Sequence, residues 1–186
     1  NWDYYSQHLT ELLAVWQGGL SFHGAIIGMC IGCWWFARQN KIPWLQVTDA
    51  LALAGAQGLF FGRMGNFING ELFGRPTDSW VGIIFPQGGL MPRHPSQLYE
   101  AIFEGLVLCL ILWLVKSRVK IYGIVSAFFL GGYGFFRFCI EFFREPDAQL
   151  GLYFGAFSMG QILCFLMILF AFVIYFFAKK QQNFVR

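Results

Sequence analysis

The chain has 186 residues, of which 57% are hydrophobic and only 12% are charged, whereas about 25% of residues are charged in an ordinary soluble domain. Phenylalanine alone occurs 23 times. A soluble fold of this length could not bury so much aromatic surface, so we expect lipid to surround much of the chain. The net charge of +3 is not gathered into a basic stripe, so we expect no nucleic-acid partner.

Five apolar stretches approach the length of about 20 residues that a helix needs to cross a bilayer. They cover residues 19–37, 44–61, 101–115, 121–143 and 153–178. The runs are continuous, whereas the strands of a membrane barrel would alternate polar and apolar residues. We therefore predict an all-α fold: a polytopic membrane helical bundle with five transmembrane helices, forming one integral-membrane domain over residues 1–186. The stretch 62–98 is too polar and too rich in Gly and Pro to span, and we expect a long loop there.

The positive charges predict the orientation of the bundle. Eight of the 13 cations follow the first, third or fifth predicted segment: Arg38, Lys41, Lys116, Arg118, Lys120, Lys179, Lys180 and Arg186. If the segments alternate in direction, all eight lie on one side of the membrane, and an excess of Lys and Arg marks the cytoplasmic side. The N-terminal tail, the 62–98 loop and the turn at 144–152 then face outward, so the loop is extracytoplasmic.

The remaining cations are all arginines: Arg63, Arg75, Arg93, Arg137 and Arg144. Arginine presents a planar fork of donors that matches a phosphate or carboxylate group and tolerates partial desolvation. This distribution suggests an anion site that faces outward or lies within the membrane.

Neither a metal nor a cofactor is expected. Cys30 and Cys33 lie one turn apart in an apolar run with no second pair, so packing explains them better than zinc or redox chemistry. The three histidines have no metal-ligand spacing.

Charged residues inside an apolar segment are expensive, so they usually face a partner or a cavity. Arg137 and Glu141 are four residues apart near the outer end of the fourth segment, which places them on one helix face, and Arg144 follows three residues later. These residues are either a structural ion pair that locks two helices together or part of a substrate site.

Histidine is the obvious candidate for moving a proton near neutral pH. His23 stands near the start of the first apolar segment, with Ser21 and several glycines around it. It is either a hydrogen-bonded core residue or a proton acceptor. His94 lies on a turn next to Pro95, which we expect at the first helical position ahead of the third segment, and this motif could be mainly structural.

The sequence GRMGNFINGELFGRP, residues 62–76, concentrates polar groups where the second apolar segment ends. It carries Arg63, Asn66, Asn69 and Glu71, and its glycines allow backbone amides to approach an anion. Such a stretch could do no more than cap helices. Because Arg137 is also predicted at the outer side of the membrane, we favour a clamp for a lipid phosphate.

Four motifs, GGLSFHG, GRMGNFINGELFGRP, RHPSQLYEAIFEG and YGFFRFCIEFFREPD, closely resemble those of the bacterial prolipoprotein diacylglyceryl transferase family. The likeness covers most of the chain, from about residue 18 to 147, and the second motif is long and specific. The resemblance implies a seven-helix enzyme of the bacterial inner membrane that catalyses the first step of lipoprotein maturation. Its members move the diacylglyceryl group of phosphatidylglycerol onto the lipobox cysteine of a prolipoprotein and release glycerol 1-phosphate.

The resemblance also assigns roles to residues of this sequence. The family's essential histidine falls on His23, and its second essential arginine falls on Arg137 with its companion acid on Glu141. The signature residues fall on Arg63, Asn66, Glu71 and Gly74. The family has a functional tyrosine in its first membrane helix, and this chain has five predicted spans rather than seven. We therefore expect a chain that lacks the N-terminal part of the family's fold and is inactive alone.

These roles suggest a mechanism in which His23 accepts the thiol proton and Arg63 and Arg137 neutralise the leaving phosphate. Asn66 would donate to the phosphate or to the head-group glycerol, and Glu141 would hold Arg137.

Two other classes of protein compete with the enzyme. A transporter could use Arg137 and Glu141 as a broken-helix substrate site, but such transporters usually repeat the motif, and neither arginine motif recurs here. A scaffold could use the same groups only to join helices. Loss of activity without loss of folded protein on substitution of Arg63 would distinguish the enzyme from the scaffold.

Overall fold

The computed structural model describes residues 22–145, 152–153 and 157–185. The chain divides into two compact units, residues 1–44 and residues 45–186. The first unit contains helix α2 (Phe22–Asn40), and α3 (Trp44–Asn69) starts at its last residue. The elements described next belong to the second unit.

Each of the five predicted segments contains a helix, and the all-α prediction is confirmed for the described residues. After α3, the chain forms α4 (Ser96–Glu100), a π-helical stretch η4 (Ala101–Val107) and α5 (Leu108–Arg118), which together make one continuous helix. Helices α6 (Ile124–Ile140) and α7 (Met159–Val185) follow. Between them, β1 (Leu152–Tyr153) and β2 (Phe157–Ser158) pair antiparallel.

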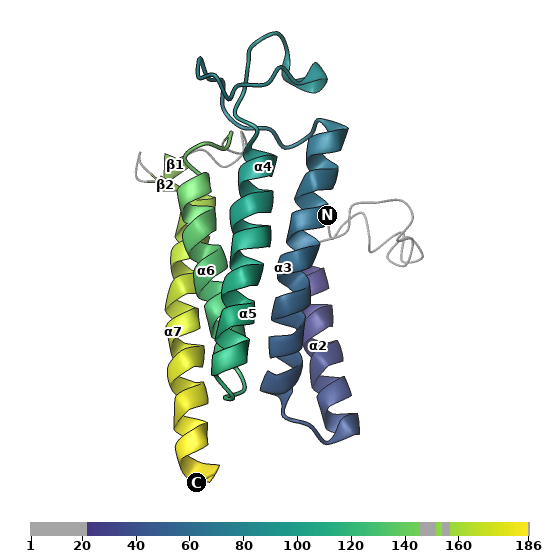
Figure 1. Ribbon diagram of the computed structural model, residues 1–186, viewed down its shortest axis with the longest axis vertical. Helices are drawn as coiled ribbons and strands as arrows, with labels where there is room; N and C mark the ends of the chain where they lie inside the picture. The colour runs from purple at the N-terminus through teal and green to yellow at the C-terminus, as the bar shows by residue number, and fades with distance from the viewer. Residues whose placement is uncertain (1–21, 146–151, 154–156, 186) are drawn as a thin grey trace, which may run out of the picture. The chain divides into compact units, whose positions relative to one another are not determined.

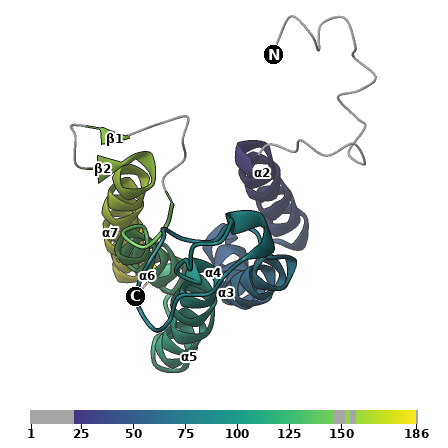
Figure 2. The same ribbon diagram turned by 90° about the horizontal axis from the view of Figure 1, so that it is seen from above.

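Within the second unit the helices run side by side. In both views α6 lies between α7 and α5, and α5 lies between α6 and α3 (Figures 1 and 2). The end of α3, the start of α4, the end of α6 and the start of α7 all lie at one end of this unit (Figure 1). We call this end the loop end, because the connection over residues 70–95 covers it.

Many large apolar side chains are exposed, whereas several charged side chains are buried. Phe61, Phe170 and Phe176 are more than half exposed, whereas Glu100 and Glu104 are 0% exposed. Two helices among the described residues are long and apolar enough to cross a membrane, Ser96–Arg118 and Met159–Gln181, and Ile124–Ile140 is apolar but shorter. This arrangement is the reverse of a soluble fold and fits a lipid environment.

Helix α3 extends beyond its predicted end at residue 61 and stops at Asn69. Gly70 ends it with a left-handed φ of 69°. The N–H of Gly70 donates to Phe67 O (3.1 Å) and the N–H of Glu71 donates to Asn66 O (3.0 Å), which together form a Schellman motif. The prediction of a loop from residue 62 was therefore wrong for its first eight residues, which form the last turns of α3.

Small residues bring the helices of the second unit close together. A Cβ added at Gly105 would lie 2.7 Å from Cα of Phe60, and one at Gly132 would lie 2.6 Å from the side chain of Leu108. The core on this contact consists of Ala52, Leu53, Ala56, Leu108, Leu112 and Val125. It fixes the continuous helix between α3 and α6 and so determines where Glu100 and Glu104 lie.

The end of the second unit opposite the loop end carries a separate polar contact. The Asp49 carboxylate of α3 accepts the N–H groups of Gly123 (2.7 Å) and Ser126 (2.8 Å) and the Ser126 hydroxyl (2.7 Å). Gly123 is the N-cap residue of α6. A carboxylate at a helix N-terminus satisfies free amides and favours the helix dipole, so Asp49 ties α3 to α6.

Candidate functional site

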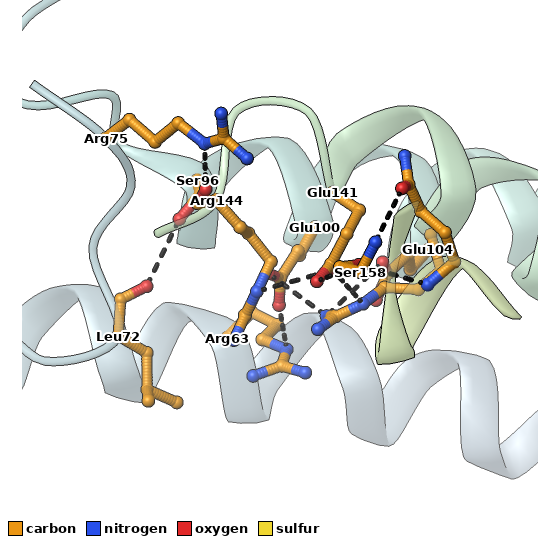
Figure 3. Close-up of polar contacts among 11 residues, drawn as sticks. Arg63, Leu72, Arg75, Ser96, Glu100, Glu104, Glu141, Arg144 and Ser158 are labelled. Carbon is orange, nitrogen blue, oxygen red and sulfur yellow. Dashed lines mark hydrogen bonds and ion pairs between the residues drawn. The ribbon is translucent and has the colours of Figure 1, made fainter. Parts of the chain in front are cut away.

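Three arginines converge on the carboxylate of Glu100 at the loop end (Figure 3). Arg63 Nε lies 2.5 Å from Glu100 Oε2. Arg144 Nη1 lies 2.6 Å from Oε1, and Arg137 Nη1 lies 3.2 Å from the same oxygen. The arginine side chains are 15–19% exposed and that of Glu100 is 1% exposed. Arg63 and Arg137, the two arginines of the clamp predicted from the sequence, therefore both contact Glu100, and the binding of a lipid phosphate stays a prediction.

Two more carboxylates complete this charged cluster. Arg137 Nε lies 3.2 Å from Glu141 Oε2, which confirms the predicted ion pair, and Arg137 Nη1 lies 3.9 Å from Glu104 Oε1. Arg144 Nε lies 3.7 Å from Glu141 Oε2. Three guanidinium groups therefore face three carboxylates. Buried charges are tolerated only when they are paired, and we call these six residues the arginine–glutamate cluster.

Glu100 and Glu104 were missed in the sequence, although the motif YEAIFEG contains them. Two carboxylates four residues apart at the start of an apolar helix have the same free-energy cost of burying charge in an apolar segment that drew attention to Arg137 and Glu141. Glu100 ends α4, and Glu104 lies within the π-helical stretch η4. π-Helical turns inside α-helices occur frequently at functional sites.

Glu104 is the least satisfied member of the cluster. It is fully buried, and neither of its carboxylate oxygens accepts a hydrogen bond from the described residues. Its distance of 3.9 Å to Arg137 is an ion-pair contact too long for a hydrogen bond. A buried carboxylate of this kind is costly unless a further donor completes its surroundings.

The signature motif extends the cluster through side-chain hydrogen bonds. Arg63 Nη1 donates to Asn66 Oδ1 (3.4 Å), and Asn66 Nδ2 donates to Glu71 Oε1 (2.9 Å). The amide of Asn69 also donates to Glu71 Oε1 (3.3 Å). The hydrogen bonds from Asn66 and Asn69 lower the pKa of Glu71 below its usual value. Glu71 thus orients Arg63 through Asn66, while Glu100 pairs with Arg63 directly.

Gly74 packs the loop onto the end of α6. Its N–H donates to His94 O (2.8 Å), and it pairs with Arg144 in an isolated β-bridge. A Cβ at this position would collide with the carbonyl oxygens of Phe143 and His94. Only glycine fits here, so the close contact between loop and helix explains this signature residue in structural terms.

The other two arginines that the sequence places on the outer side contact the loop rather than the cluster. Arg93 Nη1 lies 2.7 Å from Glu145 Oε2 and donates to Gly74 O (3.3 Å), and its guanidinium lies 4.9 Å from the ring centre of Phe73. Arg75 Nε donates to Arg144 O (2.7 Å), as Figure 3 shows. Arg75 thus holds the backbone of Arg144, and Arg93 ties the loop to the neighbouring Glu145.

Glu141 also connects the cluster to the start of α7. The Ser158 hydroxyl donates to Glu141 Oε1 (3.1 Å) (Figure 3). Ser158 N–H donates to Gln161 Oε1 (3.0 Å) and Gln161 N–H donates to Ser158 Oγ (3.2 Å), which is a capping box at the first turn of α7. A Cβ at Gly160 would lie 2.8 Å from the Glu141 carboxylate. The acid that holds Arg137 therefore also interacts with a helix N-terminus.

The histidines play different parts. His94 Nδ1 lies 3.1 Å from the Tyr99 hydroxyl, and the His94 ring packs edge-on against Phe143, which fits the structural interpretation of its motif. Pro95 is the N-cap of α4, one position before the first helical position at which the sequence predicted it. His23 lies in α2, in the other compact unit, and its side chain is outside the described part of the structure. Its role stays a prediction.

An apolar pocket of about 330 Å³ opens beside the cluster. It lies between the continuous helix and α6, and its lining includes Tyr99, Phe103, Phe136, Cys139 and Phe143. Tyr99 directly precedes Glu100, so an apolar surface and a charged cluster adjoin on the same helix.

An apolar exterior around a buried arginine–glutamate cluster defines an α-helical membrane protein with a polar centre near one end of its helices. The family model described as prolipoprotein diacylglyceryl transferase matches residues 2–177. The chain belongs to this family.

Relatives named phosphatidylglycerol–prolipoprotein diacylglyceryl transferase are similar over most of the chain. The protein of Geobacter sulfurreducens is 56% identical over 169 residues, which cover 91% of this chain and 65% of the relative. That of Paracidovorax citrulli is 50% identical over 182 residues, covering 96% of this chain and 67% of the relative. The chain therefore spans about two thirds of the length of these relatives.

Proposed function

We propose that the protein containing this chain transfers the diacylglyceryl group of phosphatidylglycerol to the lipobox cysteine of a prolipoprotein. In this reaction the cysteine sulfur forms a bond to the carbon of the diacylated glycerol that carries the phosphate. The C–O bond of that carbon breaks, glycerol 1-phosphate leaves with the electron pair, and the thiol proton passes to a base. The arginine–glutamate cluster in a chain of this family is the observation that carries the proposal.

The cluster supplies the charge that the leaving group requires. Cleavage of the C–O bond places negative charge on a phosphate, and guanidinium groups in a low-dielectric site stabilise such charge. Each guanidinium has five N–H donors. Arg63 and Arg137 therefore keep donors for a phosphate while Glu100 holds them in place.

The carboxylates orient these donors and help to recognise the lipid. Glu100 and Glu141 fix Arg137, and Glu71 with Asn66 fixes Arg63. Glu104 accepts no hydrogen bond from the described residues, and the two hydroxyl groups of the phosphatidylglycerol head group are suitable donors for it. The apolar pocket beside Tyr99 offers room for part of an acyl chain.

His23 is the proposed base. A free thiol has a pKa of about 8.5, so a nearby imidazole raises the fraction of reactive thiolate at neutral pH. His23 carries this role by the family resemblance of its motif GGLSFHG.

The proposed topology has five membrane-crossing helices, α2, α3, the continuous helix through α5, α6 and α7, in the bacterial inner membrane. The cations that follow the first, third and fifth spans favour the cytoplasm. The loop end, with the connection over residues 70–95, then faces the extracytoplasmic side. The prolipoprotein cysteine reaches its acceptor position from that side.

The test is a transfer assay with radiolabelled phosphatidylglycerol and a lipobox peptide, using the full-length enzyme. Arg137→Lys keeps the charge but loses the fork, so we expect a loss of roughly 100-fold or more in rate. Arg118→Lys, an exposed position at the end of α5, is the matched control and should keep the wild-type rate. Wild-type turnover in Arg137→Lys would refute the forked contact.

The base assignment has its own experiment. His23→Gln keeps a polar side chain of similar size but has no basic nitrogen, so the rate at neutral pH should fall and should no longer respond to pH near 6–7. A near-normal rate with an unchanged pH profile would remove His23 from the chemical step.

A further inference from the structure

A second pocket lies at the C-terminal end of α2, within the first compact unit. It has a volume of about 380 Å³ and is lined by Trp34, Ala37, Arg38, Lys41, Ile42 and Trp44. Pockets that hold small molecules or head groups usually measure about 300–1,000 Å³. None of its residues belongs to the arginine–glutamate cluster, and the proposed reaction makes no use of it.

The pocket carries positive charge without any acid. Arg38 and Lys41 line it, and the sequence from residue 22 to 44 contains neither Asp nor Glu. Within the described residues, no carboxylate lies within ion-pair distance of either cation. The pocket therefore offers two cationic groups to an anion from outside the described chain.

The backbone at Lys41 adds an independent observation. Lys41 has a left-handed φ of 55°. Its N–H donates to Arg38 O (3.4 Å) and the N–H of Ile42 donates to Ala37 O (3.1 Å), which is the Schellman pattern that ends a helix. Glycine is the usual residue at this position, and a side chain there has a conformational cost. Lysine at such a place suggests that its charge has a use.

The aromatic residues of the pocket indicate where that anion lies. Trp34 and Trp44 are about half exposed, and the Arg38 guanidinium lies 5.3 Å from the ring centre of Trp34. Tryptophan gathers at the boundary between lipid tails and water, at the level of the head groups. The exposed Ile31 and Phe36 of the same helix supply an apolar surface for the tails.

We propose that this pocket binds the phosphodiester head group of an anionic phospholipid. Arg38 and Lys41 neutralise the phosphate, the two tryptophans flank the glycerol region, and the acyl chains lie along the outside of α2. This site goes beyond the proposed transfer reaction, because it needs neither the cluster nor the base. In the proposed topology it lies in the cytoplasmic leaflet, where basic groups near the membrane surface attract anionic lipids.

The experiment counts lipids by native mass spectrometry of the purified full-length protein, titrated with dioleoyl phosphatidylglycerol in detergent. Wild-type protein should retain one lipid more than Arg38→Gln/Lys41→Gln, whose affinity at this site should be about ten-fold or more weaker. Arg38→Lys/Lys41→Arg keeps both charges and should retain the lipid. Equal lipid counts and affinities in wild type and Arg38→Gln/Lys41→Gln would overturn the proposal.

Three further measurements exclude simpler explanations. Arg118→Gln/Lys120→Gln removes the same charge elsewhere and should bind lipid like wild type. An equal loss of lipid in this variant would show unspecific electrostatic attraction instead.

Lys41→Gly relieves the left-handed strain, so it should raise thermal stability while weakening lipid retention. Undiminished lipid retention in this variant would contradict the assignment. Inorganic phosphate at millimolar concentration should not displace the lipid, and displacement would indicate a site for small anions. These experiments measure lipid binding and not transfer activity. Their results therefore test the pocket even if the proposed transfer reaction is wrong.

Discussion

Arg63 and Arg137, which come from different helices, contact opposite oxygens of the same buried carboxylate. That carboxylate is Glu100, and it accepts Arg144 as well. Two guanidinium groups close enough to contact one carboxylate would repel each other if no acid lay between them. Glu100 thus lets the bundle bring three guanidinium groups together at the loop end.

Replacing Glu100 should affect stability more than replacing any exposed acid. In Glu100→Gln three arginines lose their shared negative charge in a buried place, and we expect a loss of about 3–5 kcal/mol. Thermal unfolding in detergent measures this loss. Glu145→Gln is the matched control, because its ion pair with Arg93 is about half exposed on the acid side and should contribute less than about 1 kcal/mol. Similar effects from both substitutions would contradict a central role for Glu100.

Gly74 and Gly62 belong to the same motif and should respond in opposite ways to alanine. Gly74→Ala places a Cβ against the carbonyl oxygens of Phe143 and His94, so the loop should detach from α6 and transfer activity should fall. Gly62 lies in α3 with no atom within 4 Å of an added Cβ, so Gly62→Ala should stabilise the helix by up to about 1 kcal/mol. Limited proteolysis of the loop and the transfer assay measure the effect of Gly74→Ala, and thermal unfolding in detergent measures that of Gly62→Ala. An intact loop in Gly74→Ala would disprove the packing role.

Replacing Asp49 should lower the stability of the fold without changing the rate of the chemical step. Asp49→Ala leaves the amides of Gly123 and Ser126 without their acceptor, which costs about 1–3 kcal/mol. Because this contact lies at the end opposite the cluster, the rate of the protein that remains folded should be close to wild type. A normal melting temperature, or a folded but inactive enzyme, would each oppose this assignment.

Glu71 predicts a particular pH response of the signature motif. Hydrogen bonds from Asn66 and Asn69 lower its pKa in the folded protein. The stabilisation from these bonds is therefore present above the unfolded pKa of about 4.3 and is lost as the pH falls through the lower, folded pKa. Between pH 5 and 8, Glu71 should stay ionised and contribute no slope to the activity profile. Wild type and Glu71→Gln should then have parallel pH profiles in that range, whatever their absolute rates, and a change of slope would show that Glu71 titrates there.

The helices could be predicted from the sequence because the length of an apolar stretch is a local property of the chain. The end of α3 was not, since the polar residues of GRMGNFIN suggested a loop although Gly70, not Gly62, ends the helix. Local pairs were also accessible, as for Arg137 and Glu141 at a spacing of four.

Contacts between distant parts of the chain could not be predicted in the same way. Nothing in the spacing of Arg63 and Glu100 shows that they meet, because their approach depends on the packing of Gly105 against Phe60. The arginines of the loop illustrate the same limit. Arg75 and Arg93 are arginines predicted on the same side of the membrane as Arg137. In the structure, Arg75 donates to a backbone carbonyl, and Arg93 contacts a backbone carbonyl and the exposed Glu145.

The most direct test of this account is a structure of the full-length protein with phosphatidylglycerol bound. The account predicts that the lipid phosphate lies within hydrogen-bond distance of both Arg63 and Arg137, with Glu100 still contacting both guanidinium groups from the opposite side. A phosphate bound elsewhere, with these two arginines paired only to carboxylates, would contradict it.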